Sequence, residues 1–585
     1  MKFLRNLLAV LVGLGIFFGL FFVIGIGIVA SSTSDDSVPL EGPGILRLKL
    51  SGPIVERAEP NPFAEFVPFA GTVGTGLHQI KSAIREAKND PNIQGILLEP
   101  SLLAAGYATL REIRQELISF QEDSDKFVIA YGEIFTEGDY YLASAAEQVY
   151  LHPVGDVEFN GLSSEVTYIK GTLDKLGVEP QIFRVGQYKS AVEPLMRTDM
   201  SDASREQITS YLNAMYATYL QDVAASRNTD VATLSALSKA MTVRNGALAK
   251  EHGLVDDLKY FDEILALMNE NIGKEEGEDL KLYSLTRYLN SFDAGDDYSS
   301  NRVAVIYGEG SIASGSSTNG TIGSDDFARE IRKARENDRV KAIVIRVNSP
   351  GGSALASDVI WREVKLAAEE KPVIASMGDV AASGGYYIAM AADQIVAQPN
   401  TITGSIGIFA VLFNAQELLN DKLGVTTETV NTGDYSGLFT MSRPLTPAEK
   451  DIIQRQVEAG YETFTGKAAE GRGMNIDDLK ALAGGRVWAG NEALENGLVD
   501  RLGSLDDAIH LAAEEAGIAD DYMVKHYPQE KSLAEELEEL LSGRTYEERM
   551  MQEQFGEHYR TIKMLRNAAQ YEGIQARLPY EVVIY

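Results

Sequence analysis

The chain has 585 residues, of which 45% are hydrophobic and 24% charged, which is enough apolar material for several packed domains and excludes global disorder. Its 85 acidic and 53 basic residues give a formal net charge of −32, so we do not expect it to bind the phosphate backbone of nucleic acids. The chain has no cysteine, which excludes disulfides, thiolate metal sites and cysteine nucleophiles, and none of its six histidines has metal-ligand spacing, which disfavours a zinc hydrolase.

A long apolar segment comes first, at residues 7–30. These residues carry no charge, and as a helix they would span roughly 36 Å, enough for a hydrocarbon core of about 30 Å. Lys2 and Arg5 precede the segment and the polar residues 31–36 follow it, so the positive-inside rule places residues 31–585 on the far side of the membrane. The alternative is a cleaved signal peptide, whose apolar region is usually about 7–15 residues long. Because the segment at residues 7–30 is much longer than that, we expect an uncleaved anchor. We expect a single pass, because no later stretch is long and apolar enough to span.

After a linker at residues 31–44, the chain contains two similar halves. Four pairs of segments occur in the same order with a nearly constant offset, which indicates a duplication of a whole domain. The pairs are 84–90 (IREAKND) with 331–338 (IRKAREND), 140–146 (YYLASAA) with 386–392 (YYIAMAA), 175–178 with 422–425 (KLGV), and 253–256 with 497–500 (GLVD). We therefore expect one domain at residues 45–270 and a second at 301–515, joined by a polar linker at 271–300. Residues 516–585 form a charged, mostly helical tail to which the sequence assigns no role.

Each half alternates short apolar strands with helical patterns. In the second half the expected strands are residues 303–307, 342–347, 373–376 and 394–397, with helices at 326–336 and 356–370 between them. This alternation is typical of βαβ units, and it predicts an α/β fold with mostly parallel sheets.

Two glycine-rich loops follow strands of the second half. They are residues 348–353 (NSPGGS) and 381–386 (AASGGY). Ligands of α/β sheets bind at the carboxyl ends of strands, and unpaired amides of a Pro-Gly-Gly turn suit an oxyanion. In the second loop Ser383 has only small neighbours, so a substrate backbone could approach its hydroxyl. Each loop taken alone is also explained as a simple turn or a helix cap.

A nucleophilic serine needs a base, and no histidine lies near either loop in the sequence. The duplication points to a lysine instead. Lys189 in the first half corresponds to Ser436 in the second, whereas Ser383 corresponds to Glu137, and the first half lacks the Gly-Gly loop. The candidate base and the candidate nucleophile are thus divided between the halves, which predicts one site assembled from both. A surface lysine is the simpler explanation of Lys189 alone.

These segments together resemble the signal peptide peptidase A family in its long, two-repeat, membrane-anchored bacterial form. The similarity extends over about residues 45–515 but not over the charged tail. The motifs that carry it are residues 188–194 (YKSAVEP), 348–352 (NSPGG), 378–386 (GDVAASGGY) and 403–407 (TGSIG).

The resemblance implies a tandem Clp/crotonase fold and a serine–lysine protease that degrades signal peptides left in the membrane after secretion. It implies that Ser383 is the nucleophile, Lys189 the general base and Ser405 the hydroxyl that orients the lysine. The backbone amides of Gly352 and Gly384 would form the oxyanion hole. The resemblance further implies a homotetramer in the bacterial inner membrane, with the catalytic part on the periplasmic side and no metal or cofactor.

Two other functions remain open at this point. A crotonase-like acyl-CoA enzyme would share the fold and the oxyanion chemistry without a covalent serine. A membrane-tethered scaffold derived from an inactive duplicated protease would need neither oxyanion chemistry nor a covalent serine, although the second half retains the candidate nucleophile and both glycine loops.

Overall fold

The computed structural model describes residues 39–58, 74–274, 280–292, 299–318, 320–529 and 574–577. The apolar segment at residues 7–30 and most of the tail lie outside these ranges. Within the described ranges, no helix is long and apolar enough to cross a membrane.

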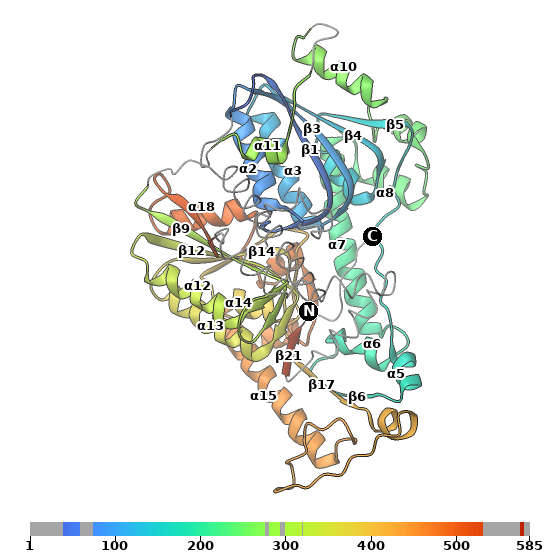
Figure 1. Cartoon of the computed structure of the whole chain (residues 1–585), viewed down its shortest axis with the longest axis vertical. Coiled ribbons are helices and arrows are strands. Elements are labelled where there is room, and N and C mark those ends of the chain that lie inside the picture. Colours follow the sequence, from blue (N-terminus) through green and yellow to red (C-terminus); the bar gives the residue numbers. More distant parts are fainter. Residues whose placement is uncertain are drawn as a thin grey trace, which may run out of the picture.

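The first half forms a seven-stranded parallel sheet in the order β2-β1-β3-β4-β5-β7, with β8 beside β1 (Figure 1). Its strands are β1 (Gly44–Val55), β2 (Thr75–Gly76), β3 (Ile93–Ala104), β4 (Phe127–Phe135), β5 (Gln148–Val157), β7 (Asp257–Leu258) and β8 (Leu282–Ser284). Its helices are α2 (Leu77–Asn89), α3 (Tyr107–Glu122), α4 (Glu137–Ala143), α7 (Asp202–Ser226), α8 (Val231–Lys239), α9 (Gly246–Glu251), α10 (Phe261–Asn271) and α11 (Leu285–Leu289). Strand β8 lies in the segment expected to be a linker, so part of that segment extends the first sheet.

The second half repeats this plan with an eight-stranded sheet in the order β18-β16-β14-β12-β9-β20, with β15 beside β14 and β19 beside β15. The strands are β9 (Arg302–Glu309), β12 (Val340–Ser349), β14 (Val373–Ala382), β15 (Gln394–Ala397), β16 (Ile402–Gly404), β18 (Val487–Ala489), β19 (Arg501–Leu502) and β20 (Met523–Tyr527). The helices are α12 (Ser324–Glu336), α13 (Ala354–Ala368), α14 (Gly384–Ala389), α15 (Pro447–Arg472), α16 (Ile476–Leu482), α17 (Gly490–Glu495) and α18 (Leu505–Glu515). The α/β fold with two tandem domains is thus confirmed.

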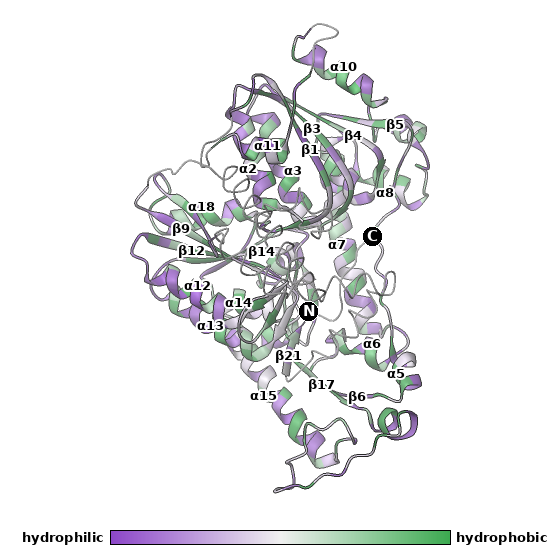
Figure 2. Ribbon diagram, viewed as in Figure 1, coloured by the Kyte–Doolittle hydropathy of each residue, from purple (hydrophilic) through white to green (hydrophobic). Residues whose placement is uncertain are grey.

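Both sheets are buried on both faces, which explains why their strands are apolar throughout. In β9, Ala304 and Ile306 face the main core of the second half, while Val303 and Val305 pack against α18 on the other face. Figure 2 shows hydrophobic residues along these strands and on the inner sides of the helices. Parallel sheets covered by helices on both faces have this pattern.

A third sheet joins the halves, in the order β11-β10-β13-β21-β17-β6. Its strands are β6 (Glu179–Arg184), β10 (Ser311–Ala313), β11 (Thr321–Gly323), β13 (Gly351–Ser353), β17 (Phe409–Asn414) and β21 (Ile574–Arg577). The shorter helices near it are α5 (Lys170–Leu176), η1 (Ser190–Val192), α6 (Glu193–Met196) and η2 (Leu418–Lys422). Because β6 of the first half pairs antiparallel with β17 of the second, the chain that follows β6 enters the second half.

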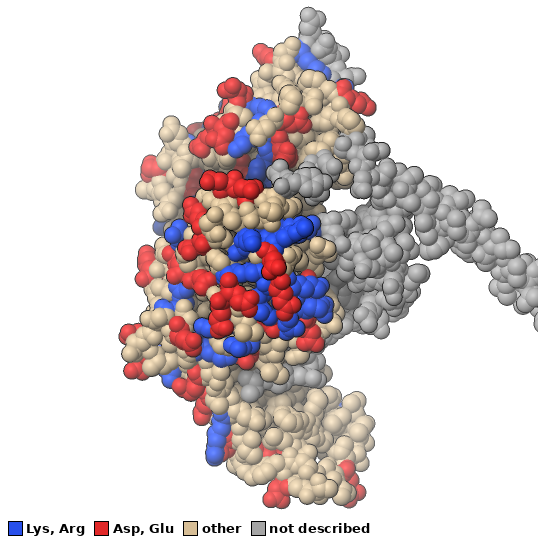
Figure 3. All heavy atoms as spheres, turned by 90° about the vertical axis from the view of Figure 1, so that its left-hand side faces the viewer, with Lys and Arg blue, Asp and Glu red and all other residues tan. Residues whose placement is uncertain are grey.

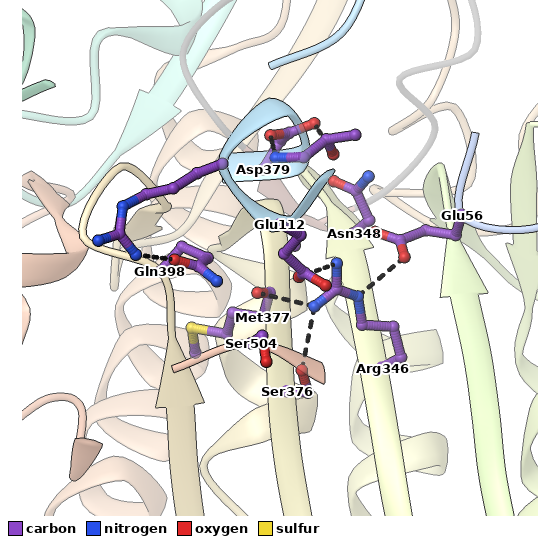
Figure 4. Close-up of polar contacts among 12 residues, drawn as sticks. Glu56, Glu112, Arg346, Asn348, Ser376, Met377, Asp379, Gln398 and Ser504 are labelled. Carbon is purple, nitrogen blue, oxygen red and sulfur yellow. Dashed lines mark hydrogen bonds and ion pairs between the residues drawn. The ribbon is translucent and has the colours of Figure 1, made fainter. Parts of the chain in front are cut away.

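Buried charges also hold the two halves together (Figure 4). Arg346 of β12 forms ion pairs with Glu56 at 2.9 Å and with Glu112 of α3 at 2.8 Å, and all three side chains are almost completely buried. Asp379 of β14 accepts hydrogen bonds from the backbone N–H groups of Gly106 and Thr109 at the start of α3. The carboxylate therefore caps the N-terminus of a helix in the other half, where negative charge is favoured.

Candidate active site

Ser383 stands at a sharp turn between β14 and α14. Its backbone has φ 55° and ψ −111°, a conformation that is strained for a residue with a side chain. Two hydrogen bonds fix the turn: the Ser383 N–H donates to the Gly404 carbonyl at 2.8 Å, and the Ser383 carbonyl accepts from the Tyr387 N–H at 2.8 Å. The Ser383 hydroxyl does not cap the helix. It is therefore left for another partner.

That partner is Lys189, which the first half supplies. Lys189 follows β6 and lies just before η1, and its Nζ is 2.8 Å from Ser383 Oγ, although the residues are 194 positions apart. Neighbouring backbone encloses the lysine closely: the Tyr188 N–H donates to the Gly484 carbonyl, and a Cβ built on Gly407 would lie 3.2 Å from Lys189 Cδ. The side chain of Lys189 is completely buried.

Burial sets the protonation state of this lysine. Desolvation disfavours the ammonium form and holds the pKa of Lys189 well below its ordinary value of 10.5. A neutral amine has a free electron pair, so Lys189 can accept a proton from the hydroxyl that it contacts.

Ser405 provides two further contacts to the lysine. Its Oγ and its carbonyl oxygen each lie 3.0 Å from Lys189 Nζ. Ser405 also has a positive φ of 51°, directly after β16, and its N–H donates to the Arg486 carbonyl. Three oxygen atoms thus surround Nζ and fix its direction toward Ser383.

The two glycine loops meet beside Ser383. Gly351 has φ 95°, and a Cβ built on it would lie 2.6 Å from the amide nitrogen of Gly384. A Cβ built on Gly384 would lie 3.0 Å from the amide nitrogen of Gly352. Side chains at these positions would not fit, and their absence brings the amides of Gly352 and Gly384 close together. Two converging N–H groups are the arrangement that stabilises an oxyanion.

The equivalent positions in the first half have different surroundings. The Glu137 carboxylate, at the place of Ser383, accepts hydrogen bonds from the backbone N–H groups of Asn160 and Gly161. Ser436, at the place of Lys189, accepts a hydrogen bond from the Gly433 N–H in an exposed loop. Both side chains thus stabilise local backbone, and the described residues hold one serine–lysine pair of this kind.

Two features of the site were missing from the sequence prediction. The first is the buried cluster of Arg346, Glu56 and Glu112, although an arginine inside an otherwise apolar strand is a signal for a buried acidic partner. The second is β21 of the tail, which pairs with the Gly-Gly loop. Its four residues carry no pattern that distinguishes them within the tail.

Comparison with known proteins assigns the family. Residues 120–274 and 365–519 each match peptidase family S49, and residues 295–403 match the Clp protease family. The chain belongs to peptidase family S49. The first S49 segment contains Lys189 and the second contains Ser383 and Ser405, so neither repeat alone holds the pair.

Relatives of this family cover most of the chain. "Protease 4" of Salmonella typhi is 36% identical over 552 residues, which is 91% of this chain and 87% of the relative. "Serine protease SPPA, chloroplastic" of Arabidopsis thaliana is 36% identical over 459 residues, 76% of this chain and 66% of the relative. "Putative signal peptide peptidase SppA" of Enterococcus faecium is 36% identical over 202 residues, 34% of this chain and 58% of the relative. The S49 protein is a serine protease. This family assignment argues against both alternatives, the acyl-CoA enzyme and the non-catalytic scaffold.

Proposed function

We propose that the protein is an endopeptidase with a Ser383–Lys189 dyad. The observation that carries the proposal is the 2.8 Å separation of Lys189 Nζ and Ser383 Oγ, with both side chains completely buried. Lys189 removes the hydroxyl proton as Ser383 Oγ attacks the substrate carbonyl carbon. The protonated lysine then gives this proton to the leaving amine. Water attacks the resulting ester by the same route in reverse.

The remaining residues of the site assist these steps. The amides of Gly352 and Gly384 donate hydrogen bonds to the oxyanion of the tetrahedral intermediate, a contribution of about 10²–10³ in rate for one donor. Ser405 keeps the Lys189 amine directed at Ser383. No step requires a metal or a cofactor.

A serine-reactive fluorophosphonate probe tests the dyad. Intact-mass measurement of the full-length protein in detergent should show one adduct on the wild type and none on Ser383→Ala. Ser357→Ala is the matched control, because Ser357 is also buried and its hydroxyl donates to the carbonyl of Ser353. Labelling of Ser383→Ala at the wild-type rate would exclude Ser383 as the nucleophile.

We further propose that the substrates are signal peptides in the bacterial inner membrane, and that residues 7–30 anchor the protease there with its catalytic part on the periplasmic side. The name of the Enterococcus faecium relative and the charge distribution around residues 7–30 support this proposal. Protease added to spheroplasts should digest residues 31–585. Their protection would contradict the orientation.

A homo-oligomer, with a tetramer as the expected form, completes the proposal. The arm formed by residues 415–445 exposes several large hydrophobic side chains, among them Val430 (95% exposed) and Phe439 (69%). In Figure 3 the described surface at the lower end of the molecule has few charged side chains, whereas acidic and basic side chains intermingle above it. Apolar surface of this kind is typical of contacts between proteins.

A further inference from the structure

Helix α7 of the first half contains a glutamine that is enclosed where this helix meets strand β18 of the second half. Gln207 is completely buried and lies in the second turn of α7. The start of the helix is fixed by Ser201, whose hydroxyl accepts a hydrogen bond from the Ser204 N–H at 3.1 Å. A side-chain amide is costly to bury unless both of its ends are hydrogen-bonded. The partners of Gln207 therefore indicate its role.

The amide nitrogen of Gln207 binds the segment that contains the lysine. Nε2 donates to the Tyr188 carbonyl at 3.1 Å and to Ser190 Oγ at 3.1 Å, and these residues flank Lys189 on both sides. The Ser190 hydroxyl also donates to the Tyr188 carbonyl at 3.2 Å, which closes a ring of three hydrogen bonds. Because the Tyr188 carbonyl shares a planar peptide unit with the Lys189 nitrogen, fixing this carbonyl orients the start of the lysine.

The amide oxygen of the same side chain binds the segment that supports the two serines. It accepts a hydrogen bond from the Val487 N–H in β18 at 3.1 Å. The preceding residue is Arg486, whose carbonyl accepts from the Ser405 N–H at 2.6 Å. Val487 is also opposite Gly404 of β16, and the Gly404 carbonyl accepts from the Ser383 N–H. One hydrogen bond thus reaches the backbone on which both serines depend.

This pair of contacts suits the chemistry of an amide. A side-chain amide carries a donor and an acceptor on one rigid plane, whereas a carboxylate only accepts and an ammonium only donates. Here the donor faces a carbonyl of the first half, and the acceptor faces an N–H of the second half. Gln207 therefore connects the backbone of the two halves at the site.

We propose that Gln207 is a positioning residue for the Ser383–Lys189 dyad, whose amide holds the backbone of the lysine in register with the backbone that carries Ser383 and Ser405. The inference rests on the proposed dyad. The pairing of β6 with β17 brings the two halves together, but Lys189 and Ser383 both lie in loops beyond paired strands. Their separation of 2.8 Å depends on how the two loops are held relative to each other. Gln207 acts on this separation through the backbone and not on the reacting atoms.

Gln207→Met tests the proposal in the full-length protein in detergent. Methionine is unbranched and of similar length, but it has neither the N–H nor the amide oxygen. The value of kcat per active site should fall about 10–10²-fold, since a displacement of about 1 Å can cost roughly 10²-fold. KM should stay unchanged, because both polar atoms of Gln207 bind protein and leave none for the substrate. The fluorophosphonate probe counts the active sites: it should label every molecule, but more slowly than in the wild type.

Gln398→Met is the matched control. Gln398 is also a completely buried amide that joins the halves: its Oε1 accepts from Arg111 at 2.8 Å, and its Nε2 donates to Gln115 Oε1 at 3.2 Å. These partners belong to α3 and do not flank the dyad. Gln398→Met should therefore lower the melting temperature without changing kcat per labelled site.

A conservative variant keeps the test decisive if Gln207→Met does not fold. Gln207→Asn retains the amide but is one methylene shorter, so it reaches one segment and not both, and kcat per labelled site should again fall about 10-fold. A folded variant with fewer labelled sites but wild-type kcat per site would show a purely structural role and would overturn the inference, as would an unchanged kcat in both variants. A wild type that neither reacts with the probe nor cleaves any peptide would instead refute the dyad itself.

Discussion

Gly485 lies directly against the backbone of Lys189: a Cβ built on it would be 2.6 Å from the Lys189 amide nitrogen and 2.7 Å from its Cα. Gly485 also has φ +84°, and its N–H donates to the Ile406 carbonyl. The segment after α16 therefore packs directly against the backbone of Lys189. A methyl group at position 485 would have no room there.

Gly485→Ala should consequently displace Lys189. A shift of about 1 Å in a reacting group can cost roughly 10²-fold in rate, so we expect a loss of that size in kcat with the fold retained. Gly484→Ala is the matched control. Gly484 also has a positive φ, but its nearest neighbour to an added Cβ is Gly186 Cα at 3.8 Å. Equal activity of the two variants in a peptide-hydrolysis assay would contradict this account of Gly485.

Lys189→Ala and Lys189→Arg should both lose about 10²–10⁴-fold in activity, because neither side chain can accept the proton of Ser383. In the wild type, activity should rise with pH as the remaining Lys189 ammonium loses its proton. The measurement is peptide hydrolysis from about pH 6 to pH 10. Near-normal turnover of Lys189→Ala would exclude the lysine as the base.

The same lysine should also make stability depend on pH. Its pKa is well below 10.5 in the folded protein and close to 10.5 in the unfolded chain, so between these values the unfolded chain binds more protons. The free energy of unfolding should then rise with pH in this window, by up to about 1.4 kcal/mol per pH unit, and level off above about pH 10.5. Lys189→Met lacks this contribution. Its advantage in melting temperature over the wild type should therefore shrink as the pH rises, and a constant difference would indicate a protonated lysine in the fold.

Arg346→Met should loosen the contact between the halves. It leaves the buried carboxylate of Glu56 without its cation and leaves Glu112 with Lys81 alone, and breaking a buried pair typically costs about 3–5 kcal/mol. Activity should fall as well, because the proposed base and the proposed nucleophile come from opposite sides of this contact. Arg455→Met, which removes an exposed ion pair with Asp451, should cost less than about 1 kcal/mol. Denaturant unfolding and limited proteolysis measure both effects.

Phe439→Ser should weaken self-association, because it removes an exposed aromatic ring from the arm of residues 415–445. Mass photometry should show smaller assemblies than the wild type at the same concentration. Exposed Tyr260→Ser lies away from the arm and should leave the assembly unchanged. An unchanged mass distribution for Phe439→Ser would place the interface elsewhere.

Much of the architecture could be predicted because the strands of parallel sheets, which are buried on both faces, are short apolar runs in the sequence. Strand β15 begins and ends where its apolar run does, and the loops that contain Gly352 and Ser383 follow strands as expected. Lys189 could be selected because the duplication showed which half had lost which group. Its distance from Ser383 could not be predicted, since it depends on how β6 pairs with β17.

The missed features depend on contacts that side-chain patterns do not encode. Strand β21 is held by its pairing with β13 and β17. Such backbone pairing does not require particular side chains in β21. Arg346 was visible as a charge inside an apolar strand. Its partners Glu56 and Glu112, however, are hundreds of residues away in the sequence, and ordinary helix or strand periodicity does not connect them to it.

The antiparallel pairing of β6 with β17 also has a consequence for the time at which proteolysis begins. The first half leaves the ribosome with a lysine and no nucleophile, and the second half alone would have a serine without a base. With the proposed dyad, neither half could hydrolyse peptides before both have folded and β6 has paired with β17. Completion of the fold would then itself activate the enzyme, and a nascent or partly unfolded chain would be inactive.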